Sequence, residues 1–274
     1  MSIRALSWNL FHGRDRPPDP RLFTLRSRLL ARSEANATHL QVNRDLFEEF
    51  AAVISAEEWD VALLQETPPR WSAALARACR AEGHGVHTSR NWLGPLRSMI
   101  ARRNPDLIAS NEGGSNLTLV RGEIHERRDL ELRSGPRPER RTMAFTRATP
   151  RGAEAEICIA NLHASSGREN QALAEDEVLF AAVRATQWAR TAPLLFGGDL
   201  NLRPKQTVIF SELERRHGLC PPTDPDSLDH LLVRGLEVLE APRRWPPERR
   251  EVIENGLAIR LSDHAPVEVR FDVR

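Results

Sequence analysis

Apolar runs alternate with helix-like patterns along the chain, and this alternation indicates an α/β fold. The stretch 193–201 is an apolar run that ends in two glycines, an aspartate and an asparagine, which is typical of a strand buried on both faces. Similar patterns predict further strands over residues 3–10, 59–66, 113–120, 124–132, 142–148, 156–163, 228–233 and 266–273. Helical spacing of apolar residues predicts helices over 22–30, 46–54, 70–81, 171–190 and 204–216. We therefore expect a layered α/β domain with mixed sheets.

Three segments are largely irregular, although the first contains the helix predicted over 22–30. Residues 14–44 begin with a proline-rich piece and lie between the first strand and the first major helix, so we interpret them as an insertion. Residues 83–112 and 241–250 are predicted to be irregular. No linker-like shift in composition divides the chain, so we expect one domain over 1–274 with the insertion at about 14–44.

Composition and charge narrow the function classes. The chain has 274 residues and a net charge of only +1, so no global field attracts nucleic acid or an anionic membrane. Its three cysteines lack zinc-site spacing and fit a reducing compartment. There is no signal-peptide pattern and no apolar run long enough to cross a bilayer, so the expected location is the cytoplasm.

Polar residues from a chemically useful set recur at the ends of the predicted strands. Each has an ordinary structural explanation when taken alone, but their repetition is hard to attribute to chance. They are Asn9, Glu66, His163, Asp199, Asn201, Asp229, Asp263 and His264. Because strand ends can converge on one edge of a sheet, this set predicts a single polar site.

The chemistry that such a set supports is hydrolysis of phosphate esters with a hard metal. Carboxylate and carboxamide oxygens suit Mg²⁺, and histidines with aspartate neighbours can be oriented and charged by them. A zinc site would need histidines and cysteines at short spacing, which the chain lacks. Phosphate-binding glycine loops and a G-x-S-x-G nucleophile motif are also absent.

Six short motifs resemble the successive motifs of the endonuclease/exonuclease/phosphatase superfamily, the deoxyribonuclease I-like phosphoesterases. They occur in the family's order over residues 8–267, and the fourth and sixth are the most specific. They are Trp8-Asn9-Leu10, Gln65-Glu66, Asn161-Leu162-His163, Gly198-Asp199-Leu200-Asn201, Leu228-Asp229-His230 and Ser262-Asp263-His264-Ala265-Pro266-Val267. The resemblance implies a four-layer α/β/β/α sandwich with one cleft.

The resemblance also implies roles for the site residues. Glu66, with Asn9 nearby and help from Asp263, would hold Mg²⁺ or Mn²⁺. Asp199 would orient or deprotonate the attacking water, and Asn201 would bind the phosphate or the metal. His264 would stabilise the phosphoryl oxygens or act as the general base. His163, oriented by Asp229, would protonate the leaving group or bind the phosphate.

The substrate is less well defined by the sequence. Apurinic-site endonucleases usually carry tyrosine where His163 stands, and this chain has no tyrosine. A sphingomyelinase would expose apolar membrane loops, which are not evident in the sequence, so a monomeric nuclease acting on DNA without membrane contact is preferred. The alternatives are hydrolysis of a phospholipid or inositol phosphate, and a non-catalytic binding module. Candidate substrate contacts are His12, Arg90, Asn116, Arg243 and Arg244.

Overall fold

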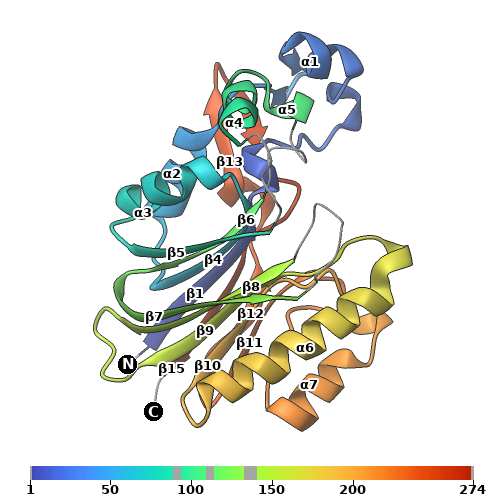
Figure 1. Ribbon diagram of the computed structural model, residues 1–274. Coiled ribbons are helices and arrows are strands. Elements are labelled where there is room, and N and C mark those ends of the chain that lie inside the picture. The colour runs from blue at the N-terminus through green and yellow to red at the C-terminus, as the bar shows by residue number, and fades with distance from the viewer. Residues whose placement is uncertain (1, 89–93, 109–113, 133–140, 273–274) are drawn as a thin grey trace.

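Two β-sheets pack face to face at the centre of the molecule, and helices cover the outer face of each sheet (Figure 1). The computed structural model describes residues 2–88, 94–108, 114–132 and 141–272. The α/β/β/α sandwich with mixed sheets that the sequence predicts is confirmed. None of the helices in these ranges combines the length and the apolar composition needed to span a bilayer.

The first sheet has six strands in the order β12-β15-β1-β4-β6-β5. Only the neighbours β1 and β4 are parallel, and the other pairs are antiparallel. The strands are β1 (Ser2–Asn9), β4 (Val61–Thr67), β5 (Glu82–His87), β6 (Ser115–Val120), β12 (Glu237–Arg244) and β15 (Val267–Asp272). The helices on its outer side are α2 (Phe47–Ala56) and α3 (Ser72–Ala78).

The second sheet has five strands in the order β11-β10-β9-β8-β7, with only β9 and β10 parallel. The strands are β7 (Gly122–Glu131), β8 (Thr142–Pro150), β9 (Ile157–His163), β10 (Leu194–Asp199) and β11 (Asp229–Arg234). The helices α6 (Gln171–Ala189) and α7 (Ile209–His217) cover its outer face. The hairpin predicted for residues 142–163 is confirmed, because β8 and β9 pair antiparallel.

Three apolar layers hold the four structural layers together. Alternate residues of the strands face the middle layer, where Leu63, Ile159 and Phe271 meet between the sheets. The opposite faces pack under the helices, with Trp8 against Phe50 on one side and a separate cluster beneath α6 and α7 on the other. The rigid sheet pair thereby fixes the positions of the strand ends.

Two glycines allow the strand ends to approach one another closely. A Cβ on Gly197 would lie 2.1 Å from the carbonyl oxygen of His230 on β11. A Cβ on Gly198, which has φ +125°, would lie 2.0 Å from the carbonyl oxygen of Leu162 on β9. Both contacts are shorter than any side chain tolerates, so only glycine permits β10 to sit between its neighbours here.

Two of the segments predicted to be irregular are partly regular, and those predictions are wrong. Residues 83–112 contain β5, α4 (Gly94–Arg103) and α5 (Pro105–Ile108). Gly83 and Gly85 weaken the strand signal of β5, which lies at the edge of its sheet. Residues 241–244 continue β12, where an edge position tolerates Pro242.

The inserted segment, residues 14–44, is hydrogen-bonded to the loop just before His264. It contains α1 (Leu25–Leu30) and a short ribbon, β2 (Glu34–Ala35) with β3 (Leu40–Gln41). A second ribbon, β13 (Glu251–Glu254) with β14 (Leu257–Arg260), lies beside it. The backbone of Arg16 donates to Arg260 (2.8 Å), and that of Ser262 donates to Arg14 (2.9 Å). These backbone hydrogen bonds thus hold the insertion against the loop that carries the last site motif.

Asp15 lies between the two hydrogen-bonded residues Arg14 and Arg16, and its carboxyl group is fully buried. Its Oδ2 accepts a hydrogen bond from the backbone of Val42 (3.2 Å), but its Oδ1 has no hydrogen-bond partner in the described part of the chain. Burial, reinforced by the charge of Asp106, raises the pKa of Asp15 to about 8. The unfolded chain releases this proton more readily, so Asp15 costs stability progressively as pH rises from about 4 to about 8.

We expect Asp15→Asn to stabilise the protein more at alkaline than at acidic pH. The substitution removes the buried charge and keeps an acceptor for Val42. The free energy of unfolding should rise by about 1 kcal/mol or more near pH 8 and by less near pH 5. Urea unfolding at both pH values measures this, and an equal shift at the two would contradict the ionisation of Asp15 as the cause.

Candidate active site

The polar strand ends of the two sheets meet at one edge of the sandwich. In the second sheet, Asp199 on β10 lies opposite His163 on β9 and Asp229 on β11. In the first sheet, Asn9 ends β1 and Glu66 lies near the end of the parallel strand β4. A hydrogen bond of 2.9 Å from Asn9 Nδ2 to Asp199 Oδ2 joins the two sheets across the site. The register of the strands therefore assembles the site.

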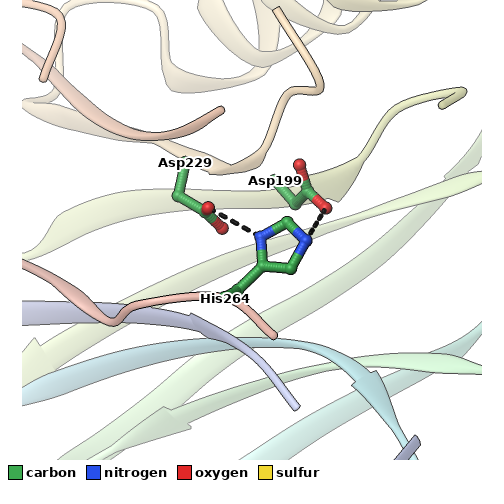
Figure 2. A group of neighbouring side chains, drawn as sticks. All are labelled: Asp199, Asp229 and His264. Carbon is green, nitrogen blue, oxygen red and sulfur yellow. Dashed lines mark hydrogen bonds and ion pairs between the residues drawn. The ribbon is translucent and has the colours of Figure 1, made fainter. Parts of the chain in front are cut away.

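His264 lies between two carboxylates, as Figure 2 shows. Its Nδ1 is 2.8 Å from Asp229 Oδ2, and its Nε2 is 3.8 Å from Asp199 Oδ2. The backbone of His264 is fixed as well, since its N–H donates to Ser262 Oγ and its carbonyl accepts from Trp8 Nε1 (both 3.0 Å). The expected orientation of His163 by Asp229 is wrong: the loop before β15 brings His264, not His163, to Asp229.

The charges around His264 favour its protonated form. Burial alone would lower the pKa of this imidazole, but Asp229 and Asp199 outweigh it and raise the pKa well above the usual value. His264 is therefore an imidazolium at neutral pH.

Asp199 is held in place at both of its oxygens. Oδ2 accepts from Asn9, and Oδ1 accepts from the backbone N–H of Asn201 (3.1 Å). The amide of Asn201 donates to the carbonyl of Ala164 (3.0 Å), which fixes the turn after β10. Burial is the main cause that raises the pKa of Asp199 to about 7, and the charge of Asp229 adds to it. A carboxyl group with this pKa can accept a proton at neutral pH.

Glu66 lies opposite this group and is surrounded by imidazoles. Its Oε2 is 3.2 Å from His12 Nε2, and its Oε1 is 3.8 Å from His163 Nε2. Burial opposes ionisation of Glu66, but the neighbouring imidazoles outweigh it and lower its pKa to about 2. Burial, with the charge of Arg141, lowers the pKa of His163 to about 3. At neutral pH the site thus contains an ionised Glu66 and a neutral His163.

The residues that could hold a divalent cation gather around Glu66. The charge of Glu66 acts on both Asp263 and Asp199 and disfavours the ionised form of each. Three carboxylates that repel one another are an oxygen-rich donor set, which a hard cation would stabilise. Asp199, Asp229 and His264 also place ligand atoms within 4.8 Å of one another. That group fits a cation less well, because Asp229 already binds Nδ1 of the charged His264.

Backbone strain concentrates at the site. Ten non-glycine residues in the described ranges have positive φ, and five of them belong to the site segments. They are Phe11 (50°), His12 (54°), Glu66 (48°), Asn201 (54°) and Ser262 (60°). A left-handed backbone costs about 1 kcal/mol or more for such residues. Half of the strained residues thus lie in the segments that position the polar side chains of the site.

The predicted substrate contacts are only partly brought to the site. His12 joins it through Glu66, and its Nδ1 has no hydrogen-bond partner among the described residues. Asn116 is buried on β6 and donates to the carbonyl of Thr142 (2.7 Å), next to Arg141. Arg90 lies outside the described residues.

The two arginines of β12 have other partners. Arg243 binds Glu268 (2.8 Å) and lines a cavity of about 170 Å³ to which none of the eight strand-end residues contributes. Arg244 pairs with Asp224 (2.6 Å). Residues 241–244 are strand and not loop, so these arginines belong to the edge strand β12, where Arg243 pairs with Glu268 on the neighbouring strand β15.

Two arginines near the site were not singled out from the sequence. Arg14 is largely buried, stacks 3.7 Å over the ring of Phe11 and lies close enough to act electrostatically on Glu66 and Asp263. Arg141 is buried and acts on His163 and His12. Arg14 follows the His12-Gly13 pair directly, which is a usable signal, whereas no sequence pattern marks Arg141.

Solved structures with the same fold cover nearly the whole chain. An endonuclease/exonuclease/phosphatase family protein from Bacteroides thetaiotaomicron is 15% identical, with 99% of this chain and 98% of that chain covered and a TM-score of 0.63. The human Nocturnin catalytic domain with bound sulfate is 14% identical (100% and 95% covered, TM-score 0.63). A mannosyl-6-phosphatase from Bacteroides thetaiotaomicron is 14% identical (98% and 99% covered, TM-score 0.64). At these identities the likeness shows the fold alone.

The family is shown by the sequence itself. No curated protein sequence matches the chain significantly. The model of the Endonuclease/Exonuclease/phosphatase family matches residues 6–264, which include all eight strand-end residues of the site. The chain therefore belongs to the endonuclease/exonuclease/phosphatase family of phosphoesterases, which generally depend on divalent metal ions.

Proposed function

We propose that this phosphoesterase hydrolyses phosphodiester bonds by direct attack of water, with DNA as its substrate. The observation that carries the proposal is the environment of Asp199. It is buried, has a pKa near 7, is fixed by Asn9 and Asn201, and lies beside the charged His264. A poised base next to a fixed positive charge is the arrangement that attack on a phosphate requires.

Each residue of the site then has one role. Asp199 accepts a proton of the attacking water, whose oxygen bonds to phosphorus as the P–O bond to the leaving group breaks, and the leaving oxygen takes its proton from solvent. Asn201 hydrogen-bonds a phosphate oxygen. His264, as an imidazolium, stabilises the negative charge on the phosphoryl oxygens, and its raised pKa argues against a role as the general base. His163 is neutral and hydrogen-bonds the phosphate, because its lowered pKa makes it a poor carrier of a proton to the leaving group.

We propose that Glu66, Asn9 and Asp263 hold Mg²⁺ or Mn²⁺. Glu66 is ionised, as a ligand must be, and its carboxylate lies within electrostatic reach of Asp263, so a cation between them would stabilise both. When bound, such a cation would polarise the phosphoryl group as a Lewis acid.

Asp229→Asn should move the pH dependence of the reaction. Without the Asp229 carboxylate, the pKa of His264 falls and less imidazolium remains at alkaline pH. The alkaline limb of the kcat profile should shift to lower pH, with a loss of about 10-fold or more near pH 8. Steady-state kinetics across the pH range measures the shift. An unchanged profile would show that the charge of His264 is not needed.

The second candidate substrate is a phospholipid. The preference for DNA rests in part on the lack of apolar membrane loops in the sequence. However, α1, α4 and α5 expose six large apolar side chains, namely Leu25, Leu29, Leu30, Leu96, Met99 and Leu107. This observation favours a lipid-facing enzyme, while hydrolysis of an inositol phosphate and a non-catalytic binding role have no comparable support.

Hydrolysis of a panel of phosphoesters tests the proposal. Plasmid DNA, single-stranded DNA, RNA, a phospholipid and a sugar monophosphate are each incubated with the protein and Mg²⁺, Mn²⁺ or EDTA. EDTA-sensitive cleavage of DNA supports the proposed function, and cleavage of the phospholipid alone supports the second candidate. The absence of EDTA-sensitive hydrolysis across this panel, with an inositol phosphate included, would favour a binding module.

A further inference from the structure

Helix α1 buries none of its three leucines, unlike an ordinary surface helix. Its only buried residue is Ser27, while Leu25, Leu29 and Leu30 are 75%, 63% and 57% exposed. A surface helix normally buries its leucines against the core. The exposed face of α1 is therefore suited to an apolar environment outside the molecule.

The neighbouring helices extend this exposed apolar face. We call α1, α4 and α5 the cap. The structure records eleven exposed large apolar side chains in its described ranges, and six of them lie on the cap. Besides the three leucines of α1 they are Leu96, Met99 and Leu107. This concentration on three short helices exceeds the scatter of single apolar residues that is normal on protein surfaces.

The cap does not need these side chains for its own packing. Polar contacts join its helices: Asn104 donates to the carbonyl of Arg28 (2.9 Å), and Arg28 donates to that of Asp106 (3.0 Å). Asn43 donates to Asn104 (2.7 Å). Hydrogen bonds thus join the helices of the cap, while its six large apolar side chains stay exposed.

The charge of the cap is positive. Its three helices contain five arginines (Arg26, Arg28, Arg97, Arg102 and Arg103) and one acid, Asp106, which is buried beside Arg14. Across the described ranges, no ion pair joins Arg26, Arg102 or Arg103 to a carboxylate. A surface that mixes exposed leucines with unneutralised arginines is complementary to an anionic lipid bilayer, which offers both acyl chains and phosphates.

Other occupants fit the cap less well. A nucleic acid would neutralise the arginines but leave the leucines in water. A second copy of the chain would bring two positive caps together, so charge repulsion opposes it. The anionic bilayer is the occupant that satisfies both features.

The cap also lies close to the site. It sits beyond the ends of β1 and β4 that carry Asn9 and Glu66 (Figure 1). Arg14 connects the two regions, because its Nη1 is 3.6 Å from Asp106 Oδ1 in the cap while its charge acts on Glu66 and Asp263. A surface bound by the cap would be near the reacting phosphate.

We propose that the cap docks the enzyme on the surface of an anionic membrane, with the site close to that surface. The docking itself does not depend on the proposed catalytic function. It adds a lipid surface as a partner of the protein, separate from the substrate proposed for the site.

Vesicle binding tests the docking directly. The protein is sedimented with vesicles of phosphatidylcholine alone or mixed with phosphatidylglycerol, without added metal. We expect binding to the mixed vesicles only, weakened by salt. The double change Leu25→Gln with Leu29→Gln should weaken binding by about 10-fold or more, and Arg26→Gln with Arg102→Gln should do the same.

Matched controls separate docking from folding and from catalysis. Ile253→Gln and Val208→Gln remove apolar side chains of similar exposure (71% and 82%) outside the cap and should leave vesicle binding unchanged. The cap variants and the unmodified protein should hydrolyse a soluble phosphodiester at the same rate. If none of them hydrolyses it, the catalytic proposal is overturned and the docking proposal is not.

Three outcomes would overturn the docking proposal. In the first, the cap variants bind the mixed vesicles as well as the unmodified protein does. In the second, the cap substitutions weaken binding to DNA but not to vesicles. In the third, sedimentation velocity shows a dimer that the cap substitutions abolish. The second outcome would assign the cap to nucleic acid, and the third would assign it to a second copy of the chain.

Discussion

Asp199→Asn should lower kcat for phosphodiester hydrolysis by about 10³-fold while the fold is retained. The substitution keeps a side-chain oxygen to accept from Asn9, but it removes the group that takes the proton of the water. Because the carboxylate of Asp199 is buried and its pKa is raised, the variant should unfold at the same temperature as the unmodified protein or higher. Single-turnover kinetics and thermal unfolding measure the two effects.

The matched control is Asp226→Asn, which changes an exposed aspartate paired with Lys205 outside the site. Its kcat should be unchanged. Near-full activity of Asp199→Asn would instead remove Asp199 from the mechanism and leave His264 as the candidate base.

Glu66→Gln should have the second largest effect, and this effect should depend on the metal. Removal of the ionised ligand weakens binding of the cation, so activity at a metal concentration that saturates the unmodified protein should fall by about 100-fold. A higher concentration of Mg²⁺ or Mn²⁺ should recover part of it. Titration of activity with each metal, before and after treatment with EDTA, gives the apparent metal affinity.

The control for this variant is Glu58→Gln, at an exposed residue whose carboxylate pairs with Arg4. Its metal titration should match that of the unmodified protein. If the unmodified protein keeps full activity in EDTA, or if Glu66→Gln loses activity that no metal concentration recovers, Glu66 does not act as a metal ligand.

Much of the fold was predictable because its strands carry strong local signals. The apolar run before Gly197 and Gly198 predicted a strand buried on both faces, and β10 lies between β9 and β11 with helices on one side and the other sheet on the other. The edge strands β5 and β12 were missed for a physical reason. Edge strands pair on one side only, so glycine and proline are tolerated there and the strand pattern is weak.

The gathering of the strand-end residues at one edge of the sandwich was predictable from the sequence, but the pairs that they form there were not. The eight strand-end residues were recognised because buried strands rarely end in such groups without a cause. The partner of Asp229 depends on how the loop before β15 folds over β11, and the sequence has no local signal for that contact. The exposed leucines of α1 show the same limit, since their helical spacing alone predicts a buried face.

The strained backbone at the site has a consequence for variation in this protein. Five residues with positive φ serve the site, so glycine at Asn201 or Ser262 would relieve strain while removing a functional side chain. In a library selected only for a high level of folded protein, these glycine substitutions should therefore become more frequent. In a library selected for catalytic activity, they should be lost. Comparing the two selections across a library of single variants would map the site by the positions where they disagree.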